Sequence, residues 1–146
     1  MMIRAALLCF SVCALVACQP NEDGPRATPD EAESTSIIAS AEALAGEYRV
    51  AGVDGEDVNL PHGITASITG ERIDVQSDCV RFAWTYRFED RLLVTEQAPV
   101  ASCRRALLPL EQALTEAVEA ADIVRRTPAN GVELSGSGRS VTMFSQ

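Results

Sequence analysis

One stretch of this chain repeats its apolar residues at helical spacing, and short alternating segments precede and follow it. Between residues 109 and 122 apolar residues recur every three or four positions, Pro109 suits a first helical turn, and Glu111, Glu116 and Glu119 are placed on the outer face. Elsewhere apolar and polar residues alternate at period two, as in half-buried β-strands. These segments are 48–53, 64–68, 72–75, 80–88, 92–96, 123–127, 132–134 and 140–144. The order predicts an α+β domain, a strongly curled antiparallel sheet with one helix packed against it.

The alternation is sharpest in segment 80–88. Its apolar and aromatic residues fall on one face and its charged or polar residues on the other. The apolar set is Val80, Phe82, Trp84, Tyr86 and Phe88, and the polar set is Arg81, Thr85 and Arg87. A face buried in the core is the favoured interpretation, and an aromatic platform for a ligand is the alternative.

The first eighteen residues have the features of a secretion signal. Arg4 supplies a positive start, and residues 5–16 carry no charge but are too few to span a bilayer, which needs about 20. The ending Leu15-Val16-Ala17-Cys18 resembles a bacterial lipobox. We therefore expect residues 1–17 to be a lipoprotein signal peptide and Cys18 to be lipidated. An ordinary cleaved signal and a buried apolar helix are the alternatives.

The residue after the lipobox bears on the location. Under the sorting rule of diderm bacteria, Gln19 resembles the residue found in outer-membrane cargo. The expected location is the outer membrane, with the protein held by its lipid and facing the periplasm. Several chains on one cysteine would hold the protein durably, because each buried methylene contributes about 0.8 kcal/mol.

Composition then changes along the chain. Residues 19–45 hold six acidic residues against Arg26 alone, together with Pro20, Pro25 and Pro29. We expect residues 18–45 to be the lipidated cysteine and a flexible acidic tether, with a helical turn or two possible in 36–44, and residues 46–146 to be the folded domain. The net charge of −9 argues against a nucleic-acid partner, since such binding needs a cationic face.

Two cysteines remain once the signal is removed and Cys18 is lipidated. Cys79 and Cys103 form an even pair in an oxidising compartment, which favours a disulfide between them over a reactive or metal-bound thiol. His62 is the single histidine, so histidine-based catalytic and metal sites are hard to build. We expect no metal and no cofactor, and an exposed loop position for His62.

The order of these features resembles a known family. A Gly46-x-Tyr48 opening strand, Cys79 before an aromatic strand, and Cys103 before a helix that carries glutamates are followed by a closing Asn130-Gly131 hairpin. This pattern is similar to the META domain of HslJ-like bacterial envelope lipoproteins, over about residues 44–144. The resemblance implies a half-barrel-like sheet, no catalytic constellation, and a role connected with envelope stress or virulence.

Other charged clusters are weaker candidates for binding. The pairs Arg104-Arg105 and Arg125-Arg126 could bind a carboxylate or phosphate, although ordinary surface charge is the commoner explanation. The acidic run at 54–59 has the composition of a calcium loop but lacks its spacing, which favours a solvated turn. The sequence singles out no residue that would bind a small ligand.

The sequence leaves two classes of function open. The first is a non-catalytic binding or interaction module in envelope maintenance or stress response, most simply a monomer, that binds an envelope protein, a small ligand or a cell-wall fragment. Within this class the alternative is an inhibitor of a periplasmic or host hydrolase. The second class is a hydrolase that uses carboxylates alone, which is disfavoured because the acidic residues are scattered over turns and a helix.

Overall fold

The computed structural model describes residues 36–146; the predicted signal peptide, the lipidation at Cys18 and most of the predicted tether lie outside these residues. Within them, ten strands join one sheet and two helices accompany it. The strands are β1 (Ser36–Ile37), β2 (Gly46–Val53), β3 (Glu56–Asp57), β4 (Ile64–Ile68), β5 (Arg72–Ser77), β6 (Val80–Glu89), β7 (Leu92–Gln97), β8 (Ile123–Arg126), β9 (Val132–Gly136) and β10 (Arg139–Ser145). The helices are α1 (Ala41–Leu44) and α2 (Pro109–Ala120).

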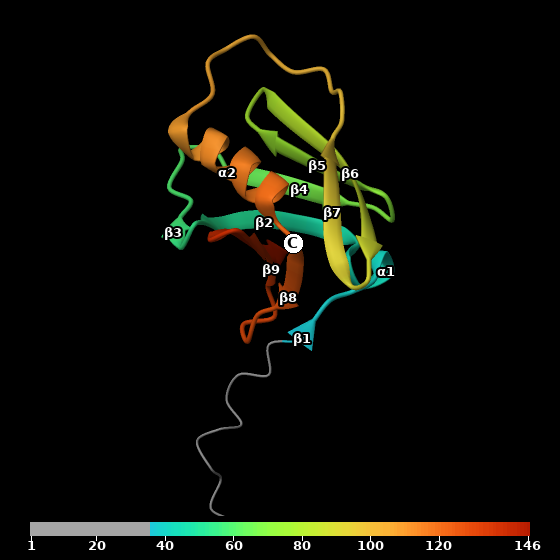
Figure 1. Cartoon of the computed structure of the whole chain (residues 1–146). Helices are drawn as coiled ribbons and strands as arrows, with labels where there is room; N and C mark the ends of the chain where they lie inside the picture. The colour runs from blue at the N-terminus through green and yellow to red at the C-terminus, as the bar shows by residue number, and fades with distance from the viewer. Residues whose placement is uncertain (1–35) are drawn as a thin grey trace, which may run out of the picture.

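The sheet is antiparallel and curls into a half-barrel (Figure 1). Its strand order is β1-β8-β9-β10-β2-β4-β5-β6-β7, and β3 pairs with β2 beside this path. The curl brings β7, at one end of the sheet, against β8, the second strand from the other end. The backbone N–H of Leu93 in β7 donates to the carbonyl of Asp122, just before β8, at 2.8 Å. Helix α2 packs against β10, β9, β2 and β7. The predicted α+β fold with a curled sheet and one main helix is confirmed.

The alternation in the sequence explains which faces are buried. In β6, Val80, Phe82, Trp84 and Tyr86 are buried in the core of the half-barrel, whereas Arg81, Thr85 and Arg87 are exposed. The core face predicted for this segment is therefore confirmed. Helix α2 adds a fully buried Leu114 to the same core and so covers the hollow of the curled sheet.

The folded domain begins earlier than predicted. Strand β1 pairs with β8, the Ile38 N–H donates to the Val124 carbonyl at 2.9 Å, and the Tyr48 hydroxyl donates to the Leu44 carbonyl at 2.7 Å. Ile38 and Leu44 are 6% and 0% exposed. Residues 36–45 therefore belong to the folded domain, and the predicted boundary at 45/46 is corrected for these residues. The helical turn expected within 36–44 is present as α1, whereas β1 was missed because two residues are too few to show a periodicity.

Leu44 provides a test of this boundary. We expect Leu44→Ala to lower the free energy of unfolding by about 2–5 kcal/mol, since it leaves a cavity in the core. Ile37→Ala is the matched control, because Ile37 lies in the same segment but is 51% exposed, and its loss should change stability little. Urea denaturation followed by circular dichroism measures both. Equal stability of the two variants would return residues 36–45 to the tether.

Candidate functional site

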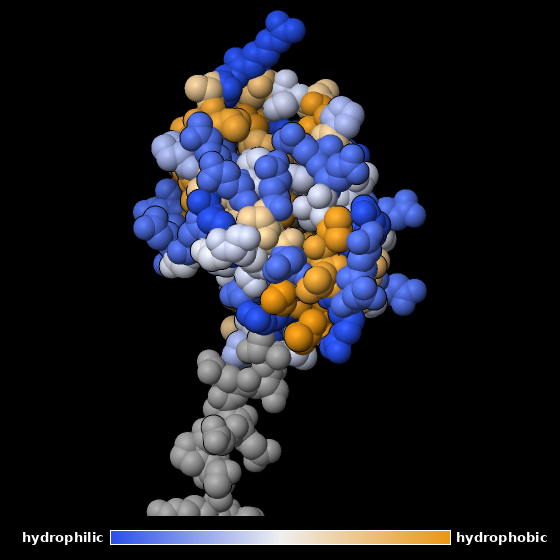
Figure 2. Space-filling model, in the orientation of Figure 1, coloured by the Kyte–Doolittle hydropathy of each residue, from blue (hydrophilic) through white to orange (hydrophobic). Residues whose placement is uncertain are grey.

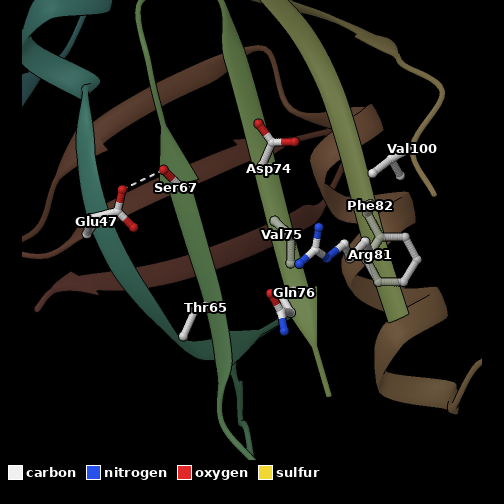
Figure 3. A pocket seen from close by; sticks show the side chains of 9 residues that line it. All are labelled: Glu47, Thr65, Ser67, Asp74, Val75, Gln76, Arg81, Phe82 and Val100. Atoms are coloured by element: carbon white, nitrogen blue, oxygen red, sulfur yellow. Dashed lines mark hydrogen bonds between the residues drawn. The ribbon is translucent and has the colours of Figure 1, made fainter. Parts of the chain in front are cut away.

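A groove of about 300 Å³ lies on the outer face of the sheet, over β2, β4, β5 and β6. Figure 3 shows the side chains that line it, which come from these four strands and from the segment after β7. The lining residues are Glu47, Thr65, Ser67, Asp74, Val75, Gln76, Arg81, Phe82 and Val100. The polar members are the outward positions of strands whose alternate residues fill the core.

Strand pairing arranges the polar residues in two rows across the sheet. In one row Glu47 pairs with Ser67, and Ser67 pairs with Asp74. In the neighbouring row Arg49, Thr65, Gln76 and Arg81 are cross-strand partners in turn. A row with two carboxylates therefore lies beside a row with two guanidinium groups. The rows are about 7 Å apart, because they are separated by two residues along each strand.

The charged groups of the groove differ in how far they are already paired. The Ser67 hydroxyl donates to Glu47, and the Arg72 Nε lies 2.8 Å from an Asp74 carboxylate oxygen. Arg81 is exposed and forms no ion pair with any residue of 36–146. The guanidinium of Arg81 is thus available to an anionic group.

The segment after β7 forms the wall of the groove beside Arg81. Its backbone follows β6: the Ala98 N–H donates to the Ala83 carbonyl at 2.8 Å, and the Arg81 N–H donates to the Ser102 hydroxyl at 3.0 Å. The disulfide between Cys79 and Cys103, with Cα atoms 5.6 Å apart, joins the middle of this segment to the residue just before β6. The predicted pairing of the two cysteines is present in the structure. Closing a loop of this length contributes about 3.5 kcal/mol in the loop-entropy view.

A second polar cluster is buried at the start of α2. Arg105 donates to both carboxylate oxygens of Glu111, each at 2.7 Å, and the Leu108 N–H donates to the same carboxylate at 2.8 Å. Glu111 is 0% exposed, so its predicted place on the outer face of the helix is wrong. The Arg105 guanidinium above all, helped by Ser77 and the Leu108 N–H, lowers the pKa of Glu111 to about 2 despite the opposing effect of burial.

Ser77 and His62 extend this cluster without forming a hydrolase site. The His62 Nε2 lies 3.1 Å from the Ser77 hydroxyl, which also hydrogen-bonds Glu111. Ser77 is 0% exposed, so no substrate reaches its oxygen. The Glu111 carboxylate bonds the serine and not the imidazole, whereas a hydrolase triad uses the carboxylate to orient the histidine. His62 is half-buried, which corrects the exposed position expected for it.

The remaining candidates are dispersed by the fold. Of the first arginine pair, Arg105 is bonded to Glu111 and Arg104 is exposed. Of the second pair, Arg125 lies 3.9 Å from Glu133, and Arg126 donates to the Ala43 carbonyl. From the acidic run, Asp54 pairs with Arg139 and accepts the Ser140 N–H. Among residues 36–146 no three potential metal ligands gather at one place. None of the helices in this part of the chain has the length and hydropathy needed to cross a membrane.

Comparison with known proteins adds information on the fold alone. No family model matches the chain, and no curated protein matches it. A solved structure, described as the NMR structure of the protein from Burkholderia xenovorans, is similar with a TM-score of 0.51 at 18% sequence identity. The match covers 88% of this chain and 98% of that one, so the similarity in fold extends over nearly the whole of that protein.

The pKa of Glu111 leads to a prediction about pH. Because this pKa is lowered from 4.5 to about 2 on folding, the carboxylate contributes up to about 3 kcal/mol of stability. That contribution is complete above about pH 4.5 and is lost as the pH falls towards 2. We expect Glu111→Gln to lower the free energy of unfolding at pH 7 by about 3 kcal/mol, and the gap to the unmodified protein to narrow below pH 4.

Chemical denaturation at pH 7, 4 and 2.5 measures this gap. Glu119→Gln is the matched control, because Glu119 lies on the same helix and is exposed, and this variant should follow the unmodified protein throughout. A Glu111→Gln variant as stable as Glu119→Gln at pH 7 would contradict a stabilising role for the ion pair.

Proposed function

We propose that this protein is a lipid-anchored protein of the outer membrane that faces the periplasm and whose domain binds a small ligand or peptide without catalysis. The observation that carries the proposal is the groove on the outer face of the sheet, where a row with Glu47 and Asp74 lies beside a row that ends in Arg81. Arg81 has no ion-pair partner among residues 36–146. This arrangement suits a ligand that carries both a cationic and an anionic group.

The spacing of the rows favours a short peptide with free ends. Its ammonium group would lie over Ser67 between the two carboxylates. The backbone of Arg81 lies two strands away and one row along, about 12 Å from that of Ser67, and its long side chain would reach back to the ligand's carboxylate. A guanidinium binds a carboxylate through two parallel hydrogen bonds, which fixes the orientation of the ligand. A peptide fragment of the cell wall or the end of an envelope protein has this chemistry.

The geometry of the acids favours binding over hydrolysis. Glu47 and Asp74 belong to β2 and β5 with β4 between them, so their backbones are about 9.6 Å apart. Both carboxylates already accept hydrogen bonds, Glu47 from Ser67 and Asp74 from Arg72. An acid held as a hydrogen-bond acceptor is suited to receive an ammonium group and poorly suited to donate a proton.

A titration tests the groove directly. We expect alanyl-alanine with free ends to shift the amide NMR signals of β4, β5 and the start of β6 in residues 19–146. Its N-acetylated and C-amidated forms should bind at least about fivefold more weakly, because each lacks one of the two charges. Arg81→Gln should weaken binding of the free dipeptide by a similar factor.

Arg87→Gln is the matched control for Arg81→Gln. Arg87 is also an outward residue of β6, but it lies outside the groove and pairs with Glu89 at 2.6 Å, so its loss should leave binding unchanged. Equal binding of the free and blocked dipeptides, or no shift with any of them, would reject this ligand class for the groove.

A second candidate function is suggested by the segment between β7 and α2. Residues 98–108 form a long loop that stands out at one end of the molecule, at the top of Figure 1, and the disulfide fixes it near its middle. Inhibitors that insert a loop into a hydrolase use such a braced, exposed segment, since rigidity reduces the entropy lost on binding. The exposed Arg104 would be its most prominent side chain.

The relationship to the META domain also stands as a proposal. The curled sheet, the cysteine before the aromatic strand β6 and the second cysteine before α2 support it. Under this proposal the groove would serve envelope maintenance or the stress response. The solved structure that shares the fold does not bear on the choice, since its likeness extends to the fold alone.

The lipid anchor rests on the sequence and needs its own experiment. We expect Cys18→Ser to prevent lipidation, so that the protein stays unprocessed or is released as a soluble form. Cys13→Ser is the matched control, since Cys13 lies in the segment removed on processing and should leave membrane fractionation unchanged. Fractionation and intact-mass spectrometry read the outcome. A Cys18→Ser protein of mature mass in the membrane fraction would refute the anchor.

A further inference from the structure

We propose that a small apolar patch beside the point where the chain enters the domain rests on the lipid surface and orients the groove away from the membrane. The patch consists of Ile37, Leu92, Val94 and Ile123. This inference rests on the proposed lipid anchor at Cys18 and adds a second contact with the same bilayer. Its chemistry is that of a phospholipid interface, apolar at depth and anionic at the headgroups.

The fold brings these four residues to one place on the outside of the half-barrel. Leu93 and Val124 point into the core, so their neighbours Leu92, Val94 and Ile123 point outward. The hydrogen bond from Leu93 to Asp122 holds β7 against the start of β8. Ile37 is the cross-strand partner of Arg125 and therefore shares the outer face of β8 with Ile123.

The patch is exposed to an extent that is unusual for this chain. Ile37 and Leu92 are 51% and 49% exposed, the two highest values among the large apolar residues of 36–146. Figure 2 shows apolar side chains gathered over β7 and towards β1, on the side where the described chain begins. An exposed cluster of this kind marks an interaction site more often than isolated apolar residues do.

Arginines border the patch on both sides. Arg87 is the cross-strand partner of Val94, Arg91 precedes Leu92, and Arg125 and Arg126 pair with Ile37 and Ser36. Acidic neighbours are present as well, since Glu89 pairs with Arg87 and lies opposite Leu92. Arginine side chains at a bilayer surface keep their charge in the headgroup region while their stems cover apolar surface, and their guanidinium groups bind phosphate.

The proposed lipid anchor would keep the patch close to a bilayer, which favours lipid as the partner of the patch. Residues 19–35, seventeen in all, separate Cys18 from Ser36, so a fully extended connection spans at most about 60 Å. The bilayer is therefore always within reach, at a high effective concentration, and a weak contact is enough to orient the domain. A second copy of the chain is a poorer fit, because a stable interface buries about 800 Å² on each partner and four partly covered side chains provide much less.

Orientation by the patch would leave the groove accessible. Arg81 in the groove and Glu89 beside the patch lie at opposite ends of β6, eight residues apart, which corresponds to about 26 Å. The loop at 98–108 lies at the same end as the groove, away from β1 (Figure 1). With the patch on the lipid, both binding candidates of the domain face the periplasm.

A single fluorescent label tests the contact in the full mature protein. With Cys18 lipidated and Cys79 bonded to Cys103, a cysteine introduced by Leu92→Cys is the one free thiol and can carry an environment-sensitive dye. The protein is reconstituted in vesicles of phosphatidylcholine and phosphatidylglycerol containing a nitroxide lipid. Leu108→Cys is the matched control, since Leu108 is 37% exposed but lies at the start of α2, at the other end of the molecule.

We expect the label at position 92 to be blue-shifted and quenched at least twofold more than the label at position 108. Equal, weak quenching in protein that floats with the vesicles would overturn the patch and leave the anchor intact. A blue shift without nitroxide quenching would indicate coverage by protein and would also overturn it. Protein that fails to float would overturn the anchor, and with it this inference.

Discussion

The ion pair between Glu111 and Arg105 fixes the position of helix α2 on the sheet. A fully buried carboxylate loses its hydration, which is unfavourable by several kcal/mol unless hydrogen bonds replace it. Here Arg105, the Leu108 N–H and Ser77 replace it together. Because Ser77 ends β5 and Glu111 belongs to the first turn of α2, this network fixes the helix start over the end of the sheet, while the disulfide holds the segment before it.

The burial of Glu111 could not be predicted from the sequence. The helical period of residues 109–122 predicts α2 correctly, but it also places Glu111 on the outer face with the other glutamates. A charged glutamate is normally exposed, and Glu111 is buried only because Arg105, six residues earlier, pairs with it. Since Arg105 reaches Glu111 through a non-helical segment, no helical spacing reveals the pair. An acidic residue at the third helical position after an arginine-bearing loop was the available signal.

The strands could be predicted from the sequence, whereas the groove could not. Alternation at period two predicted the strands from β4 to β7 and which of their side chains point outward, because one face of each is buried. It could not predict the groove, since β2 lies between β4 and β10 and the rows from Glu47 to Asp74 depend on that order. The residues of the site were visible as polar positions, but their proximity is a property of the register. At the start of the domain, two-residue β1 was too short for any periodicity.

The acidic character of the chain is compatible with an anion-binding residue in the groove. The net charge of −9 repels anions at a distance, but at physiological ionic strength that field falls off within about 8 Å. Recognition then depends on the charges next to the ligand, and Arg81 has no ion-pair partner in residues 36–146 while Asp74 is already balanced by Arg72. A rigid sheet holds these groups at fixed spacing, so little ordering is lost on binding. The same rigidity keeps the groove and the patch at opposite ends of β6, so the proposed membrane contact and the proposed ligand site would not compete for the same surface.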